Sequence, residues 1–95
     1  MLTSKQRASL RAMANTLDAV IFVGKAGVTD NVVMQADDAL SAHELIKGTV
    51  QQSAPINAKE ALQQIAQRTG AQEVASSGRK FVLYRPKPKN PVIQI

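Results

Sequence analysis

The feature that most constrains this chain is an apolar run that stops abruptly at a glycine-rich turn. Residues 20–23 read Val-Ile-Phe-Val, residues 24–27 read Gly-Lys-Ala-Gly, and Thr29 is placed to start a helix. This pattern predicts a buried strand, a tight loop and a helix N-terminus, because glycine tolerates positive φ and threonine is a preferred N-cap. A helix N-terminus favours anions, and Lys25 adds a full positive charge. The loop therefore suits a phosphate.

Hydrophobic periodicity on both sides of the loop predicts an α/β domain in the order helix-strand-helix-strand-helix-strand-strand. The expected elements are a helix from Thr3 that weakens at Asn15-Thr16, a strand over 19–23, a helix from Thr29 to His43-Glu44, a strand over 45–51, a helix capped by Asn57 and stopped by Gly70, and strands over 72–76 and 80–85. Strands joined through a helix should pair in parallel by right-handed crossovers, and the last two strands should form a hairpin. The sequence thus predicts a four-stranded mixed sheet with helices on its faces.

Local patterns make these expectations specific. Thr3 with Gln6, and Asn57 with Glu60, have the spacing of capping boxes. The strand over 19–23 is apolar without alternation, which is typical of a strand covered on both faces. Phe22 and Phe81 lie in apolar runs, at residues 20–23 and 81–84, so both are expected in the core and not as a stacking platform for bases.

Length and composition limit the class of protein. A chain of 95 residues without cysteine forms one small domain held by packing, which suits a reducing cytoplasm. No apolar run approaches the roughly 20 residues of a membrane helix, and the N-terminus lacks the apolar core of a signal peptide. We expect a single domain over 1–86 and a tail containing proline and lysine over 87–95.

The formal net charge of +5 favours a polyanionic partner such as RNA, DNA or acidic lipid. Lysines and arginines outside the loop are the further candidates for phosphate contacts. They are Lys47 on the polar face of the second strand, Arg79 and Lys80 at the hairpin, Arg85 at the end of the last strand, and Lys5, Arg7 and Arg11 on the first helix. Taken singly, each is equally typical of a solvated surface.

Catalysis and nucleotide binding have little support. The single histidine, His43, cannot share a helix face with its neighbour Glu44, and Asp37-Asp38 is typical of a solvated helix face. The loop is too short for a P-loop, which needs four residues between its glycines followed by Lys-Ser/Thr. We therefore expect no catalytic residue, metal, cofactor or small-molecule substrate.

A Gly-x-x-Gly loop that holds the nucleic-acid backbone is the device of KH domains. Gly24, Lys25, Ala26 and Gly27 form such a loop, although the tetrapeptide is also common as a plain turn from strand to helix. Because the chain has few aromatic residues on which bases could stack, binding should depend on phosphates and shape.

Three segments together resemble the CRM-domain family, in particular its stand-alone bacterial members of the YhbY type. They are GKAGVTDNVV, HELIKGTV and GRKFVLYR, and the resemblance extends to about Pro86. It implies a fold similar to the C-terminal domain of translation initiation factor three. Gly24, Lys25 and Gly27 match the family loop, and Lys47 matches its His-Glu-Leu-Ile-Lys segment. Gly48 departs from the pattern, since a larger residue is expected there.

The resemblance also implies a function. Bacterial members of this family associate with precursors of the large ribosomal subunit, so it implies RNA binding and a role in ribosome assembly. His43 and Glu44 match the family too, and we interpret them as a structural junction. The rival hypothesis is a protein-interaction adaptor on ribosomal proteins or assembly factors with incidental basic charge, and DNA binding is a third possibility.

Overall fold

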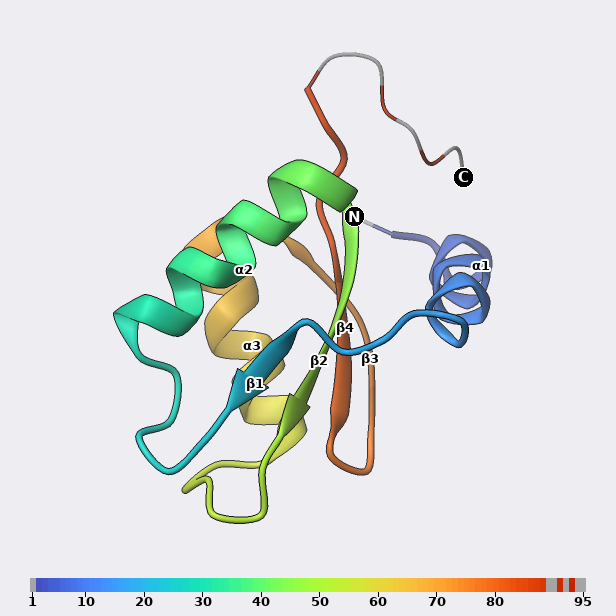
Figure 1. Ribbon diagram of the computed structural model, residues 1–95. Helices are drawn as coiled ribbons and strands as arrows, with labels where there is room; N and C mark the ends of the chain where they lie inside the picture. The colour runs from blue at the N-terminus through green and yellow to red at the C-terminus, as the bar shows by residue number, and fades with distance from the viewer. Residues whose placement is uncertain (1, 89–90, 92, 94–95) are drawn as a thin grey trace.

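The structure is a computed structural model that describes residues 2–88, 91 and 93. Three helices and four strands follow the predicted order (Figure 1). The elements are α1 (Ser4–Ala14), β1 (Ile21–Val23), α2 (Asp30–His43), β2 (Leu45–Val50), α3 (Ala58–Thr69), β3 (Gln72–Ser77) and β4 (Lys80–Tyr84). None of the described helices is both long enough and apolar enough to cross a bilayer.

The four strands form one mixed sheet in the order β1-β2-β4-β3. The crossover through α2 makes β1 parallel to β2, whereas β4 is antiparallel to both β2 and β3. The predicted α/β class, the mixed sheet and the hairpin are therefore confirmed. Strand β4 is interior and β3 lies at an edge, as the apolar run of β4 and the polar composition of β3 indicate.

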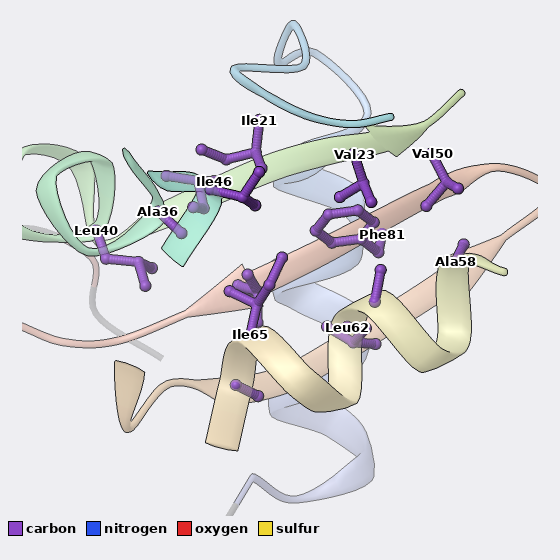
Figure 2. Packing of buried hydrophobic residues seen from close by; sticks show 14 residues of the cluster. Ile21, Val23, Ala36, Leu40, Ile46, Val50, Ala58, Leu62, Ile65 and Phe81 are labelled. Atoms are coloured by element: carbon purple, nitrogen blue, oxygen red, sulfur yellow. The ribbon is translucent and has the colours of Figure 1, made fainter. Parts of the chain in front are cut away.

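The helices cover the sheet unequally. Helices α2 and α3 pack on one face over most of the core, including Ile21, Val50, Ile65 and Phe81 (Figure 2). Helix α1 lies against the opposite face, where Leu10 and Ala14 meet side chains of β2, β3 and β4. Because α1 is a single short helix, it leaves part of this second face open.

The prediction that the first strand is covered on both faces is wrong. Strand β1 lies at the edge of the sheet and has only three residues. Ile21 and Val23 are buried under α2 and α3, but the Phe22 side chain is 53% exposed on the other face. The run is apolar on both sides, yet α1 covers the far strands instead of β1. The predicted core position of Phe22 is therefore corrected, whereas Phe81 is fully buried.

Gly48 is explained by packing. A Cβ built on Gly48 would overlap the Phe81 ring, which lies against the β2 backbone at the paired position on β4. The absence of a side chain therefore makes room for the largest fully buried side chain of the core. The departure from the family pattern at this position coincides with an aromatic ring that fills the space.

The predicted helix boundaries are set by local hydrogen bonds. The capping boxes of Thr3 with Gln6 and of Asn57 with Glu60 are both present, and the Thr29 hydroxyl accepts from the Val32 N–H at 3.2 Å. These contacts satisfy N–H groups that a helix start leaves without partners. They hold α2 at the end of the glycine loop.

Candidate nucleic-acid interface

The glycine loop is an exposed turn at the end of β1. The Gly27 N–H donates to the Gly24 carbonyl at 2.9 Å, and Gly27 has a φ of 74°, a conformation that favours glycine. Lys25 and Ala26 are exposed at its tip. Within the described part of the chain, their backbone N–H groups have no hydrogen-bond partner. The loop thus offers two free amides and one ammonium group to solvent.

Helix α2 contributes less to this loop than its position suggests. Thr29 caps its first turn, and Asp30 places a carboxylate there that pairs with Arg68 at 2.6 Å. Both features compensate the positive end of the helix dipole. Lys25 and the loop amides are therefore the groups available to an anion at this point.

Two other segments meet the glycine loop at the same end of the sheet (Figure 1). The Gln51 N–H donates to the Val23 carbonyl at 2.8 Å, and the Val50 N–H donates to the Arg79 carbonyl at 2.7 Å. We call this the loop end, made of residues 24–29, 51–57 and 78–79. The sequence-predicted residues Lys25 and Arg79 are thereby brought to the same end of the molecule.

A basic groove runs from the hairpin along α1. It has a volume of about 430 Å³, and its cationic lining residues are Arg11, Lys47 and Lys80. Lys47 Nζ also donates to the Ala14 carbonyl at 3.4 Å, near the end of α1. Three predicted residues from three different elements thus line one concave surface. Lys5 and Arg7 are exposed on the first turns of α1, beyond the groove.

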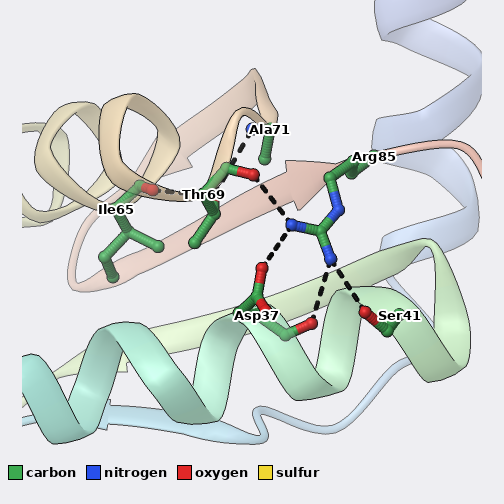
Figure 3. A network of polar contacts seen from close by, with 6 residues as sticks. All are labelled: Asp37, Ser41, Ile65, Thr69, Ala71 and Arg85. Atoms are coloured by element: carbon green, nitrogen blue, oxygen red, sulfur yellow. Dashed lines mark hydrogen bonds and ion pairs between the residues drawn. The ribbon is translucent and has the colours of Figure 1, made fainter.

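Arg85 is placed elsewhere, and both of its terminal nitrogens are hydrogen-bonded within the protein (Figure 3). One terminal nitrogen donates to Asp37 Oδ1 at 2.6 Å and to the Thr69 carbonyl at 2.8 Å. The other donates to the Asp37 carbonyl and to Ser41 Oγ, both at 3.0 Å. This guanidinium ties α2 to the C-terminal end of α3, so we leave Arg85 out of the interface proposed below.

Glu44 lies near Arg85, at the end of the sheet opposite the glycine loop. Its side chain is fully buried and accepts backbone N–H groups from Lys87 at 2.7 Å and Ile93 at 2.8 Å. Its own carbonyl accepts from the Arg85 N–H at 2.8 Å. We call Glu44, Arg85 and the start of the tail the junction end. The structural interpretation of Glu44 agrees with these contacts.

The junction also affects a neighbouring side chain. Burial raises the pKa of Tyr84 above its usual value, and the Glu44 carboxylate raises this pKa further because its charge disfavours a nearby phenolate. Ile93 packs in the cluster beneath α1 that contains Tyr84. Residues 89, 90, 92, 94 and 95 of the predicted tail lie outside the described residues.

Sequence reasoning missed the exposure of Phe22. Its apolar neighbours gave no sign of it, since only the position of β1 at the sheet edge leaves the ring uncovered. Among the described residues, no group of three or more His, Cys, Asp or Glu side chains could hold a metal ion.

The chain is similar to a known domain family and to proteins that have been given names. The model of the CRS1 / YhbY (CRM) domain matches residues 2–85. The probable RNA-binding protein YqeI of Bacillus subtilis is 36% identical over 100% of this chain and 99% of its own length. An RNA-binding protein of Haemophilus influenzae is 34% identical over 90% of this chain and 86% of its own length.

A solved structure agrees with the fold. The solution structure of the hypothetical protein SAV1595 from Staphylococcus aureus superposes with a TM-score of 0.84 at 35% identity. The match covers 100% of this chain and 99% of that one. The arrangement of helices and sheet is thus shared over the full length.

Proposed function

Because the chain belongs to the CRS1/YhbY (CRM) domain family, we propose that it is a non-enzymatic RNA-binding protein that acts in the cytoplasm on precursor large-subunit ribosomal RNA and assists ribosome assembly. RNA as the partner is supported by the names of the Bacillus and Haemophilus relatives. The ribosomal target is the function that the family resemblance implies.

One observation carries the proposal of backbone binding. In the described part of the chain, ion pairs join Arg68 to Asp30 and Arg85 to Asp37, but none involves the cations of the loop end or the basic groove. These unpaired cations are Lys25, Arg79, Arg11, Lys47 and Lys80. Unpaired cations favour a polyanion, because phosphates gain attraction without first breaking an internal pair, and three of these cations line the concave basic groove.

We assign two sets of phosphate contacts. The amides of Lys25 and Ala26, together with the Lys25 ammonium, hold one phosphate at the glycine loop. Arg79, Lys80, Lys47 and Arg11 hold others along the hairpin and the basic groove, and Lys5 and Arg7 extend the positive surface along α1. Such contacts position RNA more than they select its sequence.

The test is the salt dependence of RNA binding by Lys25→Ala. The slope of log affinity against log salt should fall by about 0.7 to 0.9, the value for one phosphate contact. Lys87→Ala is the matched control, since it removes one positive charge at the junction end and should leave the slope unchanged. An unchanged slope for Lys25→Ala contradicts the loop assignment, and no binding of RNA by the wild type contradicts the function.

The ribosomal part needs a separate experiment. Sequencing of RNA crosslinked to the protein in cells should enrich large-subunit precursor rRNA over other transcripts. Nuclease treatment of a lysate should release the protein from large-subunit particles. Association that survives nuclease treatment supports instead the protein-interaction adaptor.

A further inference from the structure

Resting on the proposed RNA binding, we infer that the open face of the sheet takes an unpaired nucleotide, with its base stacked on Phe22 and adjacent phosphates held by Lys80 and Lys47. The inference names single-stranded RNA as the preferred ligand of this face. The inference rests on the exposed aromatic ring of Phe22, which has no role in the proposed phosphate contacts.

The ring lies in a cross-strand row that ends in cationic and hydroxyl groups. Phe22 is paired with Thr49 on β2, Thr49 with Lys80 on β4, and Lys80 with Ser77 on β3. Side chains at paired positions point to the same face, and neighbouring strands are about 4.8 Å apart. The aromatic ring and the ammonium group therefore project from one surface, two strands apart.

Helix α1 does not cover this row. Phe22 is 53% exposed, and Lys80 and Ser77 are exposed as well. Lys80 also lines the basic groove beside Lys47 and Arg11. A ribose-phosphate chain lying in the groove would thus place a base within reach of the ring.

A second hollow continues this surface on the apolar side. It has a volume of about 520 Å³ and shares Lys47 with the basic groove, and its lining includes the exposed side chains of Met13, Leu17 and Val20. Val20 precedes Phe22 by two residues, so both lie toward the same face. Among the described residues that line this hollow, Asp18 is the only acid.

The combination of features favours a nucleotide over a protein strand or a second copy. A nucleotide combines an apolar, planar base with a negative charge, and here an exposed aromatic ring lies on the same face of the sheet as Lys80, which has no ion-pair partner in the described chain. The free edge of β1 has only three residues, which makes it a short template for strand pairing. Charge complementarity together with the exposed aromatic ring thus favours unpaired RNA.

The experiment compares two labelled ligands of equal length and equal phosphate number: a short RNA of adenosine and cytidine, which forms no duplex, and its abasic counterpart. By fluorescence anisotropy, the wild type should bind the base-containing RNA at least about fivefold more tightly, since stacking on an aromatic side chain has this effect or more. Phe22→Ala should bind both ligands with the affinity of the abasic one. Met34→Ala, which truncates an exposed apolar residue of α2, should retain the difference.

A second variant supplies a direct signal. The chain contains no tryptophan, so Phe22→Trp introduces a single tryptophan at the proposed stacking position, and its emission can be excited separately from that of the one tyrosine. The tryptophan emission should be quenched by the base-containing RNA and not by the abasic ligand. Thermal unfolding followed by circular dichroism checks that both Phe22 variants fold.

The outcomes separate this inference from the proposed function. Equal binding of the two ligands by the wild type overturns the stacking site and leaves phosphate binding intact. Absence of binding to either ligand and to duplex RNA overturns the proposed function as well. A change of oligomeric state in Phe22→Ala, with unchanged discrimination between the ligands, overturns the inference in favour of a protein interface.

Discussion

Basic side chains lie at both ends of the sheet, but the two ends use them differently. At the junction end, both terminal nitrogens of Arg85 are bonded to α2 and α3, and the Glu44 carboxylate is buried under the start of the tail. At the loop end, Lys25 and Arg79 are exposed and have no ion pair within the described chain. Residues of one chemical type thus act on folding at one end and are available to a ligand at the other.

The comparison teaches that the partners of a charge, and not its presence in a basic sequence, indicate its role. An arginine bound to neighbouring elements stabilises the fold and has little left to offer a phosphate. A lysine in solvent contributes little to folding and remains free to bind. Variants at the two ends should therefore separate stability from RNA affinity.

The largest loss of stability is expected for Glu44→Ala. The substitution removes a fully buried side chain and leaves the half-buried Lys87 and Ile93 N–H groups without their acceptor, so the free energy of unfolding should fall by about 3 kcal/mol. Residue 44 has a positive φ of 65°, which is unfavourable for alanine as it is for glutamate. Backbone strain therefore contributes little to the difference in stability between the variant and the wild type. Urea unfolding measures the loss, and Glu44→Gln, which keeps an acceptor, should lose less. Equal stability of Glu44→Ala and wild type would contradict the junction.

Arg85→Ala should have the next largest effect, about 2 kcal/mol in the free energy of unfolding, because it removes an ion pair and further hydrogen bonds between α2 and α3. Arg85→Lys should recover only part, since an ammonium group cannot reproduce the fork of the guanidinium. The salt slope of RNA binding should be unchanged in both variants. If the slope instead fell by the value for one phosphate contact, Arg85 would belong to the RNA interface, as its position in the sequence predicts.

A smaller effect is expected for Tyr84→Phe, and only at alkaline pH. Burial and then the Glu44 charge raise the pKa of Tyr84 in the folded state, so the unfolded chain loses this proton first as pH rises. The contribution to stability is fully present below pH about 10, the ordinary tyrosine pKa, and is lost as pH rises toward the folded-state pKa. Tyr84→Phe should therefore lose less stability than wild type above pH about 10.

The chain contains one tyrosine, so absorbance of the tyrosinate follows this titration without overlap. Glu44→Gln removes the nearby charge and should shift the midpoint to lower pH. A midpoint that does not differ between the folded and unfolded protein would contradict the assigned environment of Tyr84.

The smallest effect on stability is expected at the loop end and in the adjoining basic groove, which contains Lys80. The triple variant Lys25→Ala, Arg79→Ala and Lys80→Ala should change the free energy of unfolding by no more than about 0.5 kcal/mol, because these side chains are exposed and unpaired. Its RNA affinity should nevertheless fall, with the salt slope reduced by about two to three, the value for three phosphate contacts. A marked loss of stability with unchanged RNA affinity would show that these side chains act on folding and not on RNA binding, which contradicts the role assigned to them.

Where the determinants are local, the sequence alone was sufficient. Capping contacts span three residues, as between Thr3 and Gln6, so the starts of the helices follow from spacing. Gly70 ends α3 with a φ of 74°, as expected of a glycine at a helix C-terminus. The order of helices and strands and the turn at the glycine loop follow from the same local rules.

Only the tertiary structure decided which surfaces are open and which charges are paired. Arg85 finds Asp37 across 48 positions of the chain, and Phe22 is exposed because β1 lies at the sheet edge and α1 lies over the other strands. A short apolar run looks the same whether one face is covered or two, and a basic residue looks the same with or without a distant acid. These outcomes depend on which distant segments pack together, and that is a property of the whole fold.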